Sequence, residues 1–195
     1  AECEPYITCD DMLMRERADE VIKGLRIMRH ALQAKACMIG IEDNKPEAYE
    51  ALRSAAELFA DEDIEVVSVP TLYPTGGEKQ LIKVLTGKEV PSHGLPLDIG
   101  IVCQNVATAA AVYRALQTHE PLISRIVTVT GNGVAEQRNM EVLIGTPMHE
   151  LIEQCGGYHN DAKRLIMGGP MMGFTLTDDQ IPVIKTTNCI LVADS

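Results

Sequence analysis

Hydrophobic and polar positions in the first part of the chain follow two alternating patterns. Apolar side chains recur every three or four residues over residues 18–34 and 46–59, as they do on the buried face of a helix. Residues 36–41 and 64–69 are instead short apolar runs, and the second is rich in β-branched side chains, as strands are. The pattern therefore predicts a helix followed by a strand, a helix and a second strand.

The same alternation continues along the chain. Residues 78–86 and 106–117 have helical spacing, with Gly87 placed to end the first of these helices, and residues 99–103 form another short apolar run. Alternating strands and helices are typical of a parallel sheet with right-handed crossovers and helices on both faces. We expect a Rossmann-like α/β domain over residues 1–119.

The pattern changes in residues 120–195. Residues 125–131 alternate apolar and polar side chains, which predicts a half-exposed strand. Residues 140–144 and 165–167 predict two more strands, and residues 147–155 predict a helix between them. This arrangement favours a small α+β domain of the β-grasp type, with a less regular tail.

Net charge narrows the possible partners. Lys and Arg number 17 against 28 Asp and Glu, which gives a formal net charge of −11. Because such a charge repels phosphate backbones and anionic lipid headgroups, it argues against a nucleic acid partner. No stretch approaches the roughly 20 apolar residues that span a bilayer, so we expect no direct membrane span.

The six cysteines are scattered without any C-x-x-C spacing. This argues against a metal site in the chain and favours reduced thiols in a reducing compartment. The chain opens with Ala1 and a polar cluster rather than with Met, and we expect it to be a piece of a longer protein.

Gly76 and Gly77 follow a predicted strand and precede a predicted helix. At such a place the unpaired amides of a helix N-terminus can meet an anion, although a tight turn is the alternative interpretation. Ligands of parallel sheets bind beyond the carboxyl ends of the strands. The polar segments 42–45, 75–78 and 104–108 are expected to converge there.

Glu2 and Glu4 flank Cys3 in an extended acidic segment. A carboxylate there can accept hydrogen bonds from ribose hydroxyls or amides, or the segment can be a solvated loop. A third hypothesis makes Cys3 and Cys9 the redox pair of a thiol oxidoreductase, but no histidine lies nearby to act as a base.

Three other polar motifs have structural interpretations. Asn105 is suited to capping a helix, and Asp43 with Asn44 to forming a turn. Residues 168–173 are glycine-rich but lack the spacing of a dinucleotide fingerprint, so a packed turn is favoured.

Taken together, the motifs at residues 1–8, 73–81, 104–108, 145–157 and 167–170 resemble the C subunit of the Rnf electron-transport complex. The resemblance extends over essentially the whole chain. More distantly, the chain is similar to the flavoprotein subunit of respiratory complex I.

The resemblance implies a peripheral subunit on the cytoplasmic face of the inner membrane, in an ion-translocating complex. In that family, noncovalent FMN takes a hydride from NADH and passes electrons singly to iron–sulfur (4Fe-4S) clusters. A glycine-rich flavin loop is expected before Ala1 and the cluster domain after Ser195, so we expect this piece alone to be inactive. Membrane attachment would come through the other subunits of the complex, and the β-grasp domain (SLBB, soluble-ligand-binding β-grasp) would brace neighbouring domains.

The resemblance also assigns residues to the FMN and NADH site. Glu2 and Glu4 would lie beside the flavin and nicotinamide. The loop that lines the flavin and dinucleotide would contain Tyr73, Gly76, Gly77 and Glu78. The helix start near the flavin phosphate and ribityl chain would contain Gln104, Asn105 and Thr108.

Two positions depart from the complex I relative, which has an aspartate at the place of Ala1 and an acidic residue at the place of Gly77. No catalytic acid or base is expected, because hydride transfer depends chiefly on positioning two rings. The alternative function is a docking or ligand-binding module of the complex without catalytic activity.

Overall fold

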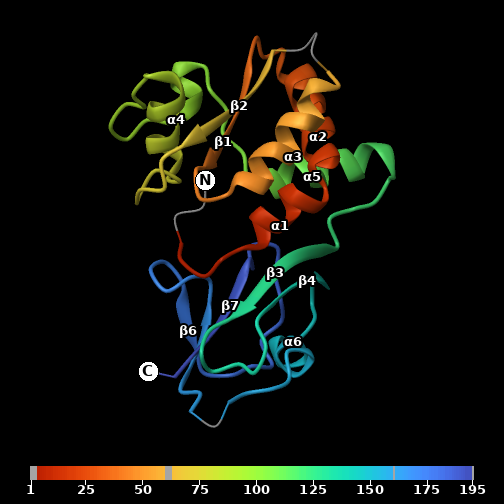
Figure 1. Cartoon of the computed structure of the whole chain (residues 1–195), viewed down its shortest axis with the longest axis vertical. Coiled ribbons are helices and arrows are strands. Elements are labelled where there is room, and N and C mark those ends of the chain that lie inside the picture. The colour runs from red at the N-terminus through yellow and green to blue at the C-terminus, as the bar shows by residue number, and fades with distance from the viewer. Residues whose placement is uncertain (1–3, 60–62, 160, 195) are drawn as a thin grey trace. The chain divides into compact units, whose positions relative to one another are not determined.

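The computed structural model describes residues 4–59, 63–159 and 161–194, and Glu2 and Cys3 lie outside this range. The chain divides into two compact units, one formed by residues 13–121 and the other by residues 4–12 together with 122–194. Figure 1 shows helices surrounding a pair of strands in the first unit and a larger sheet in the second. The predicted fold class, an α/β domain followed by a small α+β domain, is confirmed.

The sheet of the first unit contains two parallel strands in the described residues. β1 (Cys37–Glu42) pairs with β2 (Ile64–Val69) in the register Cys37↔Ile64 to Glu42↔Val69. α3 (Pro46–Glu57) connects them and begins at its proline, whose fixed φ suits the first helical turn. The predicted strand, helix and strand are therefore confirmed.

Helices cover both faces of this strand pair, as expected. α2 (Ala18–Leu32) and α3 lie on one side, and α4 (Glu78–Thr86) lies on the other (Figure 1). A Cβ at Gly40 of β1 would approach the Leu81 side chain of α4 to 2.8 Å, so the missing side chain lets the helix sit close to the strand.

α5 (Val106–Gln117) packs closely along α2. A Cβ at Gly24 of α2 would overlap the carbonyl oxygen of Ala109, so only glycine allows this approach. Arg114 Nε donates to Glu20 Oε2 across the same contact at 2.7 Å.

The strand predicted over residues 99–103 is absent, and that prediction was wrong. A short 3₁₀ helix, η1 (Pro96–Ile99), occupies its start, and residues 101–105 have no regular structure. The Leu95 N–H donates to the Asp98 carboxylate (2.8 Å), which favours the helical turn. Gly100, with φ of 73°, then ends it in the left-handed conformation. These local signals outweigh the apolar run.

The second unit contains a mixed sheet of five strands in the order β4-β3-β7-β5-β6. Its elements are β3 (Ser124–Thr130), β4 (Arg138–Leu143), α6 (Met148–Gln154), β5 (Arg164–Met167), β6 (Phe174–Leu176) and β7 (Cys189–Ala193). β3 and β7 run parallel, and the other neighbouring pairs are antiparallel. The predicted less regular tail contributes β6 and the central strand β7, so this prediction was wrong.

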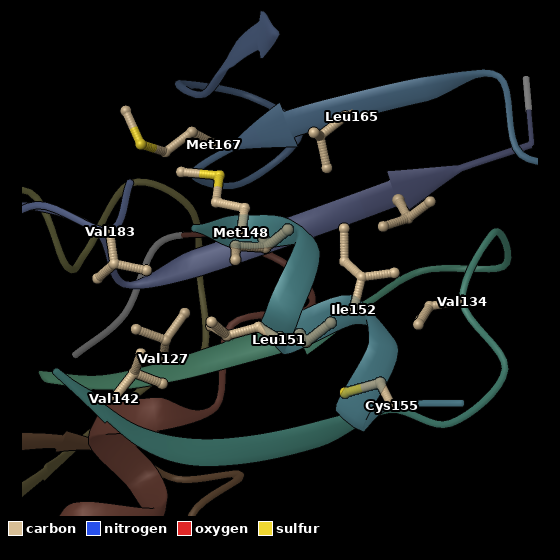
Figure 2. Close-up of a cluster of buried hydrophobic side chains, with 13 residues drawn as sticks. Val127, Val134, Val142, Met148, Leu151, Ile152, Cys155, Leu165, Met167 and Val183 are labelled. Carbon is tan, nitrogen blue, oxygen red and sulfur yellow. The ribbon is translucent and has the colours of Figure 1, made fainter. Parts of the chain in front are cut away.

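α6 lies over one face of this sheet, and the hydrophobic core of the second unit lies between the helix and the sheet. Met148, Leu151 and Ile152 of α6 are buried together with Val127 of β3 and Val142 of β4 (Figure 2). Burial of such side chains removes about 1.5–3 kcal/mol of unfavourable hydration each.

Residues 4–12 cover the opposite face of β3. The Thr8 N–H donates to Thr128 Oγ1 (3.1 Å), and the Thr128 hydroxyl donates to Asn139 Oδ1 (2.7 Å). Thr128 is therefore only 3% exposed, and the prediction of a half-exposed strand was wrong. α1 (Cys9–Glu16) follows this segment. In the described part of the chain, no helix combines the length and apolar character that crossing a bilayer requires.

Candidate cofactor-binding site

The carboxyl ends of β1 and β2 lie at one edge of the first unit, where Asp43 joins them. The Asp43 N–H donates to Val69 O (2.8 Å), which extends the strand pairing by one residue. Asp43 Oδ1 accepts hydrogen bonds from the Thr71 hydroxyl (2.6 Å) and N–H (3.0 Å). These bonds favour the ionised carboxylate and lower the pKa of Asp43. Asp43 thus fixes the start of the loop that contains the glycine pair.

That loop, residues 70–77, consists of successive tight turns. The Thr75 N–H donates to Leu72 O (2.7 Å), and the Gly77 N–H donates to Pro74 O (2.8 Å). Thr75 is buried, whereas the Tyr73 side chain is 59% exposed. The loop therefore holds an aromatic ring in solvent at the sheet edge.

Gly77 is the N-cap of α4, and Glu78 is its first residue. The first amides of any helix lack acceptors within the helix, and its dipole is positive there. A Cβ at Gly77 would lie 2.7 Å from Gln80 Oε1 and 3.2 Å from Pro74 O, so the glycine fits a tight turn as well. Both interpretations of the glycine pair are compatible with this geometry.

Asn105 is the N-cap of α5. Its Oδ1 accepts a hydrogen bond from the Ala107 N–H (2.7 Å), and its carbonyl accepts one from the Thr108 N–H (3.0 Å). The structural interpretation as a cap is confirmed. Gln104 just before it is exposed, and the Thr108 side chain is half-buried on the first turn.

Cys103 lies just before this segment and is half-buried. Burial raises the pKa of its thiol, and the negative charge of Glu78 raises it further. Glu78 therefore lies within electrostatic range of the residues just before α5. Asp43 joins the 42–45 segment to the start of the 70–77 loop, and the convergence of all three predicted polar segments stays a prediction.

Glu4 belongs to the second unit. Its Oε2 accepts a hydrogen bond from the Met171 N–H (3.1 Å), and its Oε1 is buried with no hydrogen-bond partner among the described residues. The interpretation of Glu4 as part of a solvated loop was therefore wrong. Glu2 lies outside the described residues, so its predicted role stays a prediction.

The residues described here fit FMN chemically. The helix start at Glu78 offers N–H donors of the kind that bind phosphate. Tyr73 offers an exposed aromatic surface. A flavin nucleotide needs contacts of these two kinds for its phosphate and its ring.

Sequence reasoning missed the part played by Asp43 and Thr71. The pair Asp43-Asn44 was interpreted as turn chemistry, and only the parallel register places Thr71 beside it. The signal available in the sequence was a carboxylate directly after one buried strand and a hydroxyl soon after the next.

The thiol oxidoreductase hypothesis finds no support at Cys9. This residue is 2% exposed and packs with Ile7, Cys189 and Leu191. A redox-active thiol needs access to its substrate, which this burial denies.

An α/β unit with a helix start beyond the carboxyl ends of its parallel strands is typical of nucleotide-binding proteins. The sequence pattern of the Nuo51 FMN-binding domain matches residues 1–114, and that of the SLBB domain matches residues 126–175. The chain therefore belongs to the Nuo51 FMN-binding domain family, with an SLBB domain following.

Curated relatives match the chain over nearly all its length, and each is the C subunit of an ion-translocating oxidoreductase complex. The chain is 52% identical over 195 residues to the relative from Pseudomonas aeruginosa, covering 100% of this chain and 25% of that protein. The relative from Vibrio cholerae is 54% identical over 193 residues, covering 98% and 24%. The relative from Rhodobacter capsulatus is 49% identical, covering 98% and 37%.

The expected resemblance to the C subunit of this complex is confirmed. The chain spans about a quarter to just over a third of the length of these relatives.

A solved structure shares the fold. The chain superposes on the crystal structure of NAD+-reducing [NiFe]-hydrogenase in the H2-reduced state with a TM-score of 0.75 and 21% identity. The match covers 97% of this chain and 38% of that one. At this identity the likeness establishes the fold alone.

Proposed function

We propose that the chain is the electron-input module of a membrane-bound, ion-translocating redox complex, in which NADH is oxidised through noncovalent FMN. Electrons would pass to iron–sulfur clusters outside residues 1–195. The observation that carries the proposal is the match of residues 1–114 to an FMN-binding family, in a unit whose described edge offers suitable donors.

When bound, FMN supplies the ability to accept a hydride and release electrons one at a time. The chain's own residues would bind and orient it. Gly76 and Gly77 would let the nucleotide approach the backbone, and the first amides of α4 would meet its negative charge. Tyr73 would line the flavin ring. The negative charge of Glu78 would repel a second anionic group from the start of α4.

The start of α5 would complete the flavin site. Asn105 caps the first turn of α5, which contains Thr108, and Gln104 directly precedes this cap. We propose that these three residues lie near the phosphate and ribityl chain. Glu2 and Glu4 would accept hydrogen bonds from the flavin or from NADH.

The partners follow from the relatives, which are subunits of ion-translocating oxidoreductase complexes. We propose that other subunits of such a complex bind this protein and attach it peripherally to the cytoplasmic face of the inner membrane.

Flavin binding tests the proposal directly. The protein as encoded in full is titrated with FMN while flavin fluorescence is followed. We expect saturable quenching, and at least about tenfold weaker binding for Gly76→Val, because a branched side chain blocks approach to the backbone. Lys88→Ala is the matched control, since Lys88 is exposed beyond the other end of α4.

Absence of saturable FMN binding by the unmodified protein would contradict the proposal. If other subunits of the complex still bound such a protein, a docking module without catalytic activity would be the better explanation.

A further inference from the structure

Glu42 is the last residue of β1, and its carboxylate is buried without a partner. The residue is 8% exposed, although glutamate is seldom buried to this extent unless it is paired. Its carboxylate forms no hydrogen bond or ion pair with another described residue, whereas the neighbouring Asp43 carboxylate accepts two hydrogen bonds from Thr71. A buried carboxylate without a donor is unfavourable, so a donor from a ligand would be favoured there.

The alternation of side chains along β1 directs Glu42 toward α4. A Cβ at Gly40 would lie 2.8 Å from Leu81 Cδ1, so α4 covers this face of the strand. Glu42 is two residues further along and therefore on the same face. α4 begins directly after the 70–77 loop, at the carboxyl edge, and runs back across β1. Two strand residues span roughly 7 Å, as do about four helical residues, so Glu42 lies level with the start of α4.

The start of α4 supplies donors at the same edge. The N–H groups of Glu78, Lys79 and Gln80 have no acceptor among the described residues, as expected for a first helical turn. Thr75, two residues before the N-cap, is 9% exposed, and its hydroxyl forms no hydrogen bond within the described part of the chain. The edge therefore combines donors for an anionic group with a buried acceptor for a hydroxyl.

The Glu42 carboxylate is buried but still accessible to a ligand. Neither of its oxygens is among the side-chain atoms that are both unpartnered and fully shut off from solvent. Since neither has a partner, each keeps some contact with solvent. Glu42, Thr75 and α4 all belong to the first unit.

We propose that Glu42 is a ligand-binding residue, whose carboxylate accepts a hydrogen bond from a hydroxyl of the ribityl chain of FMN. Other α/β proteins bind hydroxyl-bearing phosphate esters with the same pair of groups, because helix-start amides bind the phosphate and a carboxylate binds a hydroxyl. The inference rests on the proposed function, which assigns FMN to this edge. It adds to the site a residue of β1, outside the 70–77 loop and the start of α5.

The first measurement is the FMN affinity of the protein as encoded in full, from quenching of flavin fluorescence. Glu42→Met keeps the approximate length of the side chain and removes the acceptor. We expect the dissociation constant for FMN to rise at least about tenfold, as for loss of a hydrogen bond to a charged group. Glu65→Met is the matched control and should leave the affinity unchanged, because Glu65 is exposed near the amino end of the same strand pair.

Forms of FMN that each lack one ribityl hydroxyl identify the donor. One of them should bind the unmodified protein about tenfold more weakly than FMN does. This difference should vanish in Glu42→Met, because the hydroxyl then has no acceptor there. If every analogue lost the same affinity in both proteins, Glu42 would not be the acceptor.

Stability without ligand separates binding from a structural role. Because Glu42→Met removes an unpaired buried charge, its free energy of unfolding in urea without FMN should be unchanged or higher. A markedly less stable variant would mean that Glu42 supports the fold, against the proposed role. If Glu42→Met fails to fold, Glu42→Gln keeps the shape and should lose most of the preference for the hydroxyl, since hydrogen bonds to neutral acceptors are weaker.

Two results distinguish this role of Glu42 from the proposed function. If FMN binds and NADH reduces it, but Glu42→Met keeps the affinity and the preference for the hydroxyl, Glu42 has no part in the site and the proposed function stands. If the unmodified protein does not bind FMN, the proposed function fails and the role of Glu42 fails with it.

Discussion

Asp43 orders a loop that has no regular secondary structure. One carboxylate oxygen accepts both donors of Thr71, and the Asp43 N–H continues the pairing of the two parallel strands. The pKa of Asp43 is lowered from 3.8 by these bonds, so their contribution to stability is fully present above pH 3.8. It is lost as the pH falls through the lower pKa of the folded state, because protonation removes the charge that the donors stabilise.

Substitution of Asp43 tests this anchor. Asp43→Ala should speed hydrogen exchange of the Thr71 amide, measured by NMR, because that N–H loses its acceptor. In the unmodified protein the protection should fall as the pH drops below 3.8. Asp43→Asn is the control that keeps an oxygen acceptor, and it should retain part of the protection without this pH dependence. Unchanged Thr71 exchange in Asp43→Ala would contradict the anchor.

At the residue scale, the sequence predicted the types of side chain in the candidate site better than their contacts. Asn105 was correctly interpreted as a cap, because capping depends only on residues next to it in sequence. The bonds from Asp43 to Thr71 and from Glu4 to Met171 join residues far apart in sequence. Local patterns carry no information about such pairs.

At the scale of elements, close helix packing in the first unit depends on one position. Gly24 of α2 lies against the backbone of α5 at Ala109, and the two helices make the most extensive helix contact of this unit in its described part. Backbone atoms cannot move aside as a flexible side chain can, so any added atom must separate the helices.

Gly24→Ala should therefore destabilise the first unit by about 3 kcal/mol, at the upper end of overpacking effects, although alanine favours helices elsewhere. The measurement is the free energy of unfolding in urea, followed by circular dichroism. Ala31→Ser adds one atom at an exposed position of the same helix and should change stability by less than about 0.5 kcal/mol. Equal effects of the two substitutions would contradict the packing described for Gly24.

Element boundaries were predictable where local signals agree. Pro46 begins α3 and Gly87 ends α4, and both residues have intrinsic conformational preferences for those places. The apolar run at 99–103 misled the prediction because Pro96 and Gly100 favour a short helical turn. Apolar character alone does not distinguish a strand from a buried irregular segment.

At the scale of the whole molecule, the second unit was harder to predict than the first. β7 is a central strand at the end of the sequence, and its parallel partner β3 lies far before it along the chain. Residues 4–12 cover one face of β3, so this strand is buried on both faces. These residues lie far from β3 in sequence, which is why its local pattern did not predict this burial. Non-local pairings of this kind depend on tertiary packing.

We propose that this protein accepts electrons from NADH through bound FMN. The most direct measurement is anaerobic addition of NADH to the FMN-loaded protein as encoded in full, with the flavin absorbance followed. We expect NADH to bleach the absorbance band of the oxidised flavin. Bound FMN that stays oxidised in the presence of excess NADH would contradict it.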